Sequence, residues 1–93
     1  MSGRAQRFPA KYPVVARKGP DMFQSTICNI SIGGGCIIGE HALKKDDTIL
    51  LDYGVGQTRA VVMWTMEKMV GLKFDDRLSD LALLNIRNLK EVA

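Results

Sequence analysis

The sequence predicts an all-β domain of six short strands followed by one C-terminal helix. Short runs rich in Val, Ile and aromatic residues recur between Gly, Pro and Asp turn signals, and residues 78–93 change to helical spacing. With 93 residues, 46% of them hydrophobic, the chain has room for one domain with a modest core. Six strands favour a closed barrel or a sandwich, because closure removes exposed strand edges.

Residues 1–11 are predicted to form a flexible basic arm, because Phe8 and Pro9 among charged residues disfavour a helix. The net charge of +3 is concentrated there. Five bases precede the first acid, Asp21: Arg4, Arg7, Lys11, Arg17 and Lys18. Such an arm suggests an anionic partner, either a phosphate-bearing ligand, a nucleic acid or a membrane surface. A solvated tail that aids solubility is the alternative.

The barrel is predicted to span residues 12–77. Residues 14–16 form the apolar body of a first strand, and Arg17 and Lys18 are expected to face solvent at its end. The turn at residues 19–21 leads into a second strand over residues 22–32. Strict alternation places Asn29 and Ser31 on one face of this strand, and Cys28 and Ile30 on the other.

Three glycines, residues 33–35, follow this strand directly. They permit positive φ and let a ligand or a second backbone approach closely. Asn29 and Ser31 beside them indicate a platform for a small molecule on the sheet. The alternative is that both side chains only satisfy the turn before the glycines.

The remaining strands are predicted over residues 36–38, 48–53, 58–66 and 69–74. The loop over residues 39–47 holds the one histidine, His41, which has no Cys or His at ligand spacing and is expected at the surface. Residues 54–57 form a tight connection.

The helix is predicted over residues 78–93 and packs on the barrel. Ser79 is a suitable N-cap, and Asp80 suits the positive end of the helix dipole. Leu83 and Leu84 flank the apolar face, so a contact with a partner is an alternative to burial. That face comprises Leu78, Leu81, Ala82, Ile86, Leu89 and Val92.

Several functions are disfavoured. The sequence has no serine beside a base and no second histidine that would indicate a catalytic site. The acid pairs at residues 46–47 and 75–76 lie at turns. We therefore do not expect an enzyme. Cys28 and Cys36 have no CxxC spacing, and we expect buried free thiols without a metal. No run is long enough to cross a bilayer, and no secretory signal is present, which suggests a cytoplasmic location.

The basic arm and the strand end Asn29-x-Ser31-x-x-Gly34, with residues 60–64 and 70–74 after them, resemble the PilZ domain family. The similarity runs from about residue 4 to residue 74. It implies a six-stranded antiparallel barrel that binds the bacterial second messenger cyclic di-GMP.

The resemblance suggests a role for each site residue. Arg7 is the leading contact, because a guanidinium pairs with phosphate oxygens or a guanine edge. Asn29 can pair with a guanine edge, Ser31 can donate or accept, and Gly34 leaves space for the ligand. Lys11 stands where the family usually has a second arginine. Lysine keeps the positive charge but lacks the planar guanidinium that can form two parallel hydrogen bonds. Arg4 is a candidate substitute.

The implied function is a receptor whose arm folds over the Asn29 and Ser31 face and changes the surface offered to a partner protein. An alternative is a PilZ-like interaction module that binds no nucleotide because of Lys11. A single-stranded nucleic-acid binder ranks third, because only Phe8 and Tyr12 supply aromatic rings near the arm, so no DNA or RNA partner is expected.

Overall fold

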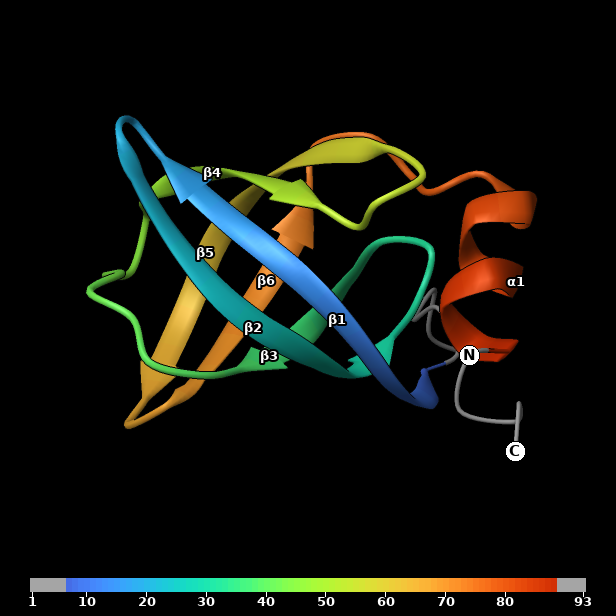
Figure 1. Ribbon diagram of the computed structural model, residues 1–93, viewed down its shortest axis with the longest axis horizontal. Helices are drawn as coiled ribbons and strands as arrows, with labels where there is room; N and C mark the ends of the chain where they lie inside the picture. The colour runs from blue at the N-terminus through green and yellow to red at the C-terminus, as the bar shows by residue number, and fades with distance from the viewer. Residues whose placement is uncertain (1–6, 89–93) are drawn as a thin grey trace, which may run out of the picture.

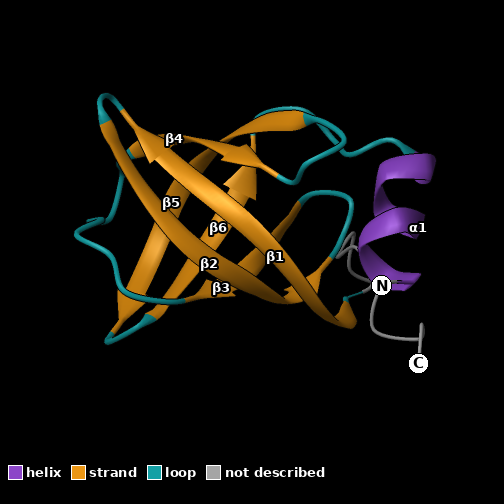
Figure 2. Cartoon of the chain, viewed as in Figure 1, coloured by secondary structure: helices purple, strands orange, loops and turns teal. Residues whose placement is uncertain are grey.

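The computed structural model describes residues 7–88 and shows a closed barrel of six antiparallel strands with one helix at its end (Figures 1 and 2). Around the barrel the strand order is β1-β2-β3-β6-β5-β4. The predicted fold class, a six-stranded antiparallel barrel with a C-terminal helix, is therefore confirmed. No helix among residues 7–88 is both long and apolar enough to cross a membrane.

The elements follow the predicted order, with some changes in their bounds. The strands are β1 (Phe8–Lys18), β2 (Asp21–Ile30), β3 (Gly34–Ile38), β4 (Thr48–Asp52), β5 (Gln57–Met66) and β6 (Met69–Phe74), and the helix is α1 (Asp80–Asn88).

Strand β1 begins earlier than predicted. Residues 8–11, assigned to the flexible arm from the sequence, are part of this strand and continue its pairing with β2, where Phe8 lies opposite Ile30. Pro9 and Pro13 fit in this strand because β1 pairs with β4 only from Val15 to Arg17. A proline lacks the N–H that a second neighbouring strand would require. The basic segment is therefore partly built into the barrel; Arg4 lies outside the described residues.

A bulge in β2 changes which side chains share a face. The pairing with β3 shifts between Ile27 and Asn29, so that both Ile27 and Ile30 point into the core, where they are buried. Cys28 and Asn29 are both only partly buried and lie on the outer side. The prediction that strict alternation separates Cys28 from Asn29 was wrong, because a bulge inserts one extra residue and resets the phase.

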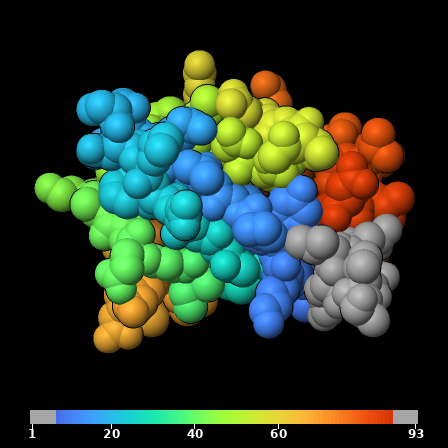
Figure 3. Space-filling view, viewed as in Figure 1, coloured from blue at the N-terminus to red at the C-terminus, as the bar shows by residue number. Residues whose placement is uncertain are grey.

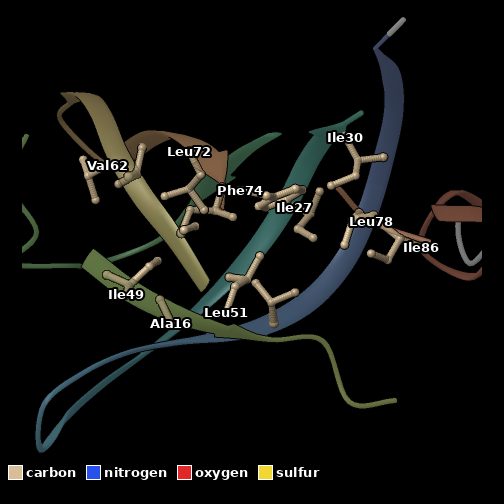
Figure 4. Packing of buried hydrophobic residues seen from close by; sticks show 14 of the residues in the cluster. Ala16, Ile27, Ile30, Ile49, Leu51, Val62, Leu72, Phe74, Leu78 and Ile86 are labelled. Carbon is tan, nitrogen blue, oxygen red and sulfur yellow. The ribbon is translucent and has the colours of Figure 1, made fainter. Parts of the chain in front are cut away.

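The core fills the barrel and extends under the helix. Figure 4 shows Ile27, Leu51 and Phe74 inside the barrel, with Leu78 and Ile86 reaching in from the C-terminal segment. The helix contacts β1 and β2, and Figure 3 shows β1 next to it at one end of the molecule.

The helix begins as predicted but turns a different face inward. The Ala82 N–H donates to Ser79 Oγ at 3.0 Å, which confirms the N-cap. Leu78, Ala82 and Ile86 are buried, whereas Leu81 is 68% exposed, so its predicted place in the buried face was wrong. Leu78, Ala82 and Ile86 follow i, i+4 spacing, and Leu83, three residues before Ile86, packs against the core beside them. Leu89 and Val92 lie outside the described residues.

His41 is half-buried rather than fully at the surface. Its Nδ1 accepts the Leu43 N–H at 3.0 Å, and its Nε2 lies 2.8 Å from the Glu67 carbonyl oxygen. Since Nδ1 accepts, Nε2 carries the proton and donates to Glu67. The ring thus ties the loop after β3 to the turn between β5 and β6.

Candidate functional site

A hollow of about 480 Å³ lies on the outer side of the barrel, over β3, β6 and β5. Glycine backbone from two strands and the loop before them forms its floor, so that no side chain rises from the centre. Larger side chains stand around this floor: Arg7, Ser31, Met63, Trp64 and Lys73. Leu72 also borders the hollow, but its side chain belongs to the core.

Arg7 and Asn29 meet at the rim of this hollow, although they are 22 residues apart in the chain. Arg7 Nη1 donates to Asn29 Oδ1 at 2.8 Å. Between described residues this is the one hydrogen bond that either side chain makes, and it uses one of the five guanidinium N–H groups. The partner is a neutral amide, so this contact does not offset the positive charge of Arg7.

The helix fixes the point at which Arg7 leaves the barrel. Arg87 lies over the ring of Phe8, 3.7 Å from its centroid, in a cation–π contact. The Phe8 ring also packs against the core, and its strand position lies opposite Ile30. Arg7 therefore directly precedes a residue that is held by the helix on one side and by the barrel core on the other.

Ser31 braces the turn into β3. Its hydroxyl donates to the Gly34 carbonyl at 3.2 Å and accepts the Gly33 N–H at 3.3 Å. The side chain is 5% exposed. These contacts correspond to the turn-forming alternative for this residue, while one acceptor lone pair of the hydroxyl still remains.

The glycine loop is held tightly by its neighbours. The Gly33 carbonyl accepts the Phe74 N–H and the Ile32 carbonyl accepts the Leu78 N–H, both at 2.8 Å. A Cβ at Gly34 would collide with the Leu72 carbonyl oxygen. Glycine is thus required at position 34 by the close approach of two backbones, which the sequence analysis offered for these glycines beside space for a ligand.

One row of residues crosses the sheet beneath the hollow. Asn29 of β2 lies opposite Cys36 of β3, Cys36 opposite Gly71 of β6, and Gly71 opposite Trp64 of β5. A Cβ on Gly71 would collide with the indole of Trp64, so the ring covers the Gly71 backbone. The Trp64 side chain is nevertheless 44% exposed. The hollow is therefore lined by a guanidinium and an aromatic ring around a bare floor. Asn29 is not among the lining residues, and its amide reaches the site through the bond to Arg7.

The family model of the PilZ domain matches residues 3–90. The chain belongs to the PilZ domain family. PilZ domains are cyclic di-GMP-binding modules, and they act as binding and effector domains. No curated protein matches the chain significantly.

The basic residues of this PilZ domain are widely separated along β1. Lys11 is exposed on the outer side of β1, near the bulge residue Cys28, and does not line the hollow. Arg17 and Lys18 lie at the far end of the strand, where Arg17 is 3.6 Å from Asp52 and Lys18 is 3.0 Å from Asp47. Only Arg7 among the described members of this segment lines the hollow.

Several residues of the hollow, Trp64 and Lys73 among them, were not among the residues selected from the sequence. Trp64 and Lys73 both lie in segments of the PilZ resemblance. Alternation along β6 gives the signal for Lys73, since Val70, Leu72 and Phe74 point inward and are buried. Its pairing with Gly34 then places Lys73 at the edge of the glycine floor. Among residues 7–88 no cluster of three metal-binding side chains is found.

Proposed function

We propose that this PilZ domain is a receptor for cyclic di-GMP, which binds in the hollow between Arg7 and Trp64. The hydrogen bond between Arg7 and Asn29 is the observation that carries the proposal. It joins the residue before β1 to the end of β2 beside the glycine floor. The family resemblance implies that these two segments bind the ligand together.

The phosphates of the nucleotide face the cationic side chains. Arg7 has four further N–H donors and can pair with a phosphate through its planar fork. Lys73 stands at the other edge of the floor and supplies a second positive charge, which offsets the missing second arginine at position 11. Lys is a point charge, so it attracts a phosphate without fixing its orientation.

The bases use the aromatic ring and the amide. Trp64 presents an indole face held over Gly71, and stacking of one base on such a ring contributes about 1–3 kcal/mol. The free amide donors of Asn29 suit the O6 and N7 acceptors of guanine. Ser31 holds the turn that shapes the floor, and its remaining lone pair can accept one donor.

The signal is a change in the surface near α1. We expect binding to draw the residues before Arg7, Arg4 among them, over the nucleotide. Arg7 is adjacent to Phe8, which contacts Arg87 of the helix, so this movement alters the surface beside the exposed side chains Leu81 and Leu84. A partner protein that contacts this end of the molecule would distinguish the two states.

Isothermal titration calorimetry with cyclic di-GMP tests the proposal, carried out at two temperatures so that a binding enthalpy near zero is not mistaken for no binding. Cyclic di-AMP is the matched comparison ligand, because it has the same phosphates but lacks guanine O6. We expect saturable binding of cyclic di-GMP and at least tenfold weaker binding of cyclic di-AMP. No heat at high micromolar cyclic di-GMP at either temperature would reject the receptor function.

A ligand-independent interaction module is the second candidate. Trp64, Met66 and Ile38 expose large apolar surfaces toward the β5–β6 end of the barrel, and exposed apolar patches are typical of protein contacts. A partner retained equally with and without cyclic di-GMP, and lost when Met66 is changed to Asp, would favour this function.

A further inference from the structure

The two cysteines lie side by side on the outer side of the barrel, next to the candidate site. Cys36 is opposite Asn29, and the bulge in β2 places Cys28 on the same side as both. Cys28 Sγ donates to the carbonyl oxygen of Cys36 at 3.4 Å. The two thiols, eight residues apart in the chain, are thus held together by strand pairing.

Their surroundings differ. Cys36 is 2% exposed, and burial first, with the hydrogen bond to the Cys28 thiol second, raises its pKa to about 12. Cys36 therefore stays protonated at neutral pH and is shielded from reagents in solution. Cys28 is only partly buried, so an oxidant from solution meets Cys28 first.

We propose that Cys28 and Cys36 are a redox-sensitive pair that hydrogen peroxide converts to an intramolecular disulfide, and that this disulfide weakens nucleotide binding at the neighbouring hollow. Peroxide oxidises the Cys28 thiol to a sulfenic acid and releases one water. The Cys36 sulfur then attacks the Cys28 sulfur and gives up its proton to the departing hydroxyl, so that a second water leaves and the S–S bond forms. Two thiols and one peroxide give one disulfide and two waters, and a dithiol reductant reverses the change.

The coupling to binding rests on the proposed function and follows from position. A disulfide requires an S–S length of about 2.05 Å and a restricted dihedral angle, so the bulge residue must move toward β3. Asn29 is the next residue along the chain and holds Arg7 through its side chain. Displacement of Cys28 therefore disturbs the Arg7–Asn29 contact at the rim. By linkage, bound nucleotide opposes the movement and makes disulfide formation less favourable.

The experiment treats the full chain with hydrogen peroxide and maps its peptides without reduction. We expect a Cys28–Cys36 crosslinked peptide, lighter by two hydrogens than the sum of its parts, which dithiothreitol removes. Cys28→Ser is the principal variant, because that side chain is partly exposed and its loss leaves the core intact. A Cys36→Ala variant gives the reciprocal control. Neither variant should form the crosslink.

Calorimetry with cyclic di-GMP then compares the reduced, oxidised and re-reduced protein. We expect roughly tenfold weaker binding after oxidation, full recovery after reduction, and no effect of peroxide on the affinity of Cys28→Ser. Only intermolecular crosslinks, or sulfinic acid on Cys28 without a disulfide, would overturn the pair itself. An unchanged affinity in the crosslinked protein would overturn the coupling. Absence of nucleotide binding before any oxidant is added identifies failure of the proposed function, while the peptide map still decides on the disulfide.

Discussion

The two ends of β1 carry the same kind of side chain in opposite electrostatic situations. At the hairpin end, Lys18 is 3.0 Å from Asp47 and Arg17 is 3.6 Å from Asp52. At the other end, Arg7 bonds a neutral amide rather than a carboxylate. Among residues 7–88, the charge at the hairpin end is locally neutralised, whereas Arg7 has no acid within ion-pair distance.

The difference shows that the side chain that pairs with each basic residue, more than the number of basic residues, determines where an anion can bind. A carboxylate beside a guanidinium competes directly with an incoming phosphate, whereas an amide orients the group and leaves its charge available. Arg7 also stands beside a bare glycine floor, while Arg17 and Lys18 are bound to acids on a loop and on β4. The following substitutions test this contrast, beginning with the largest expected effect.

Replacement of Arg7 should have the largest effect on nucleotide binding. Arg7→Ala removes a charge-assisted contact worth about 1.5–3 kcal/mol, so we expect cyclic di-GMP affinity to fall roughly 10- to 100-fold. Arg17→Ala is the matched control, because it removes an arginine of the same strand that is already paired with Asp52. Calorimetry on both variants makes the comparison. Equal losses for the two would show that net charge alone attracts the ligand, and the contrast between the two ends would be wrong.

Replacement of Trp64 tests the base contact at the same hollow. Trp64→Ala should weaken binding by roughly tenfold, since it removes one stacking surface. Met66→Ala, on the same strand but outside the hollow, should leave the affinity unchanged. Trp64 is the one tryptophan of the chain, so its fluorescence in the parent should also change on titration with cyclic di-GMP. Saturable binding by calorimetry with no fluorescence change would mean that the ligand binds elsewhere.

A methyl group on Gly71 should act through Trp64 without removing any ligand-binding group. Because the Cβ would occupy the position of the indole, Gly71→Ala should displace the ring, shift its fluorescence and weaken binding several-fold, though less than Trp64→Ala. Gly33→Ala provides a control for stability, since a Cβ there has no neighbour within 4 Å. Thermal unfolding should therefore show a loss for Gly71→Ala that exceeds the loss for Gly33→Ala. Unchanged fluorescence in Gly71→Ala would contradict the support proposed for the ring.

Much of the fold could be predicted because its signals are local. Turn residues and β-branched runs gave the order of the six strands, and the capping pattern located the start of the helix at Ser79. Closure and the inward face of the helix depend on packing between distant segments. Leu81 illustrates the limit, because its spacing fits either side of the stripe and only the position of β1 and β2 leaves it exposed.

The site was less predictable because its geometry arises from pairing between strands. The bulge at Cys28 exists only relative to β3, so alternation along β2 alone could not reveal that Cys28 and Asn29 share a side. Trp64 joins the hollow because a glycine happens to lie opposite it on β6. The family resemblance did link Arg7 with Asn29, and these two side chains are in contact. Their role in binding stays a prediction.

Loss of the ion pair of Lys18 should have the smallest effect of these substitutions. It should lower stability slightly and leave nucleotide binding unchanged. The pKa of Asp47 lies below its usual 3.8, first because the Lys44 backbone N–H donates to the carboxylate and then because of Lys18. Lys18→Met should therefore move that pKa upward, which a carboxyl NMR titration can measure. A depressed folded-state pKa stabilises the protein above the unfolded value, and the stabilisation disappears as pH falls through the folded value. The variant should thus unfold at a slightly lower temperature at pH 7 and at the same temperature as the parent in strong acid. A loss of cyclic di-GMP affinity in Lys18→Met would instead extend the binding site to the hairpin end and remove the distinction between neutralised and available charge.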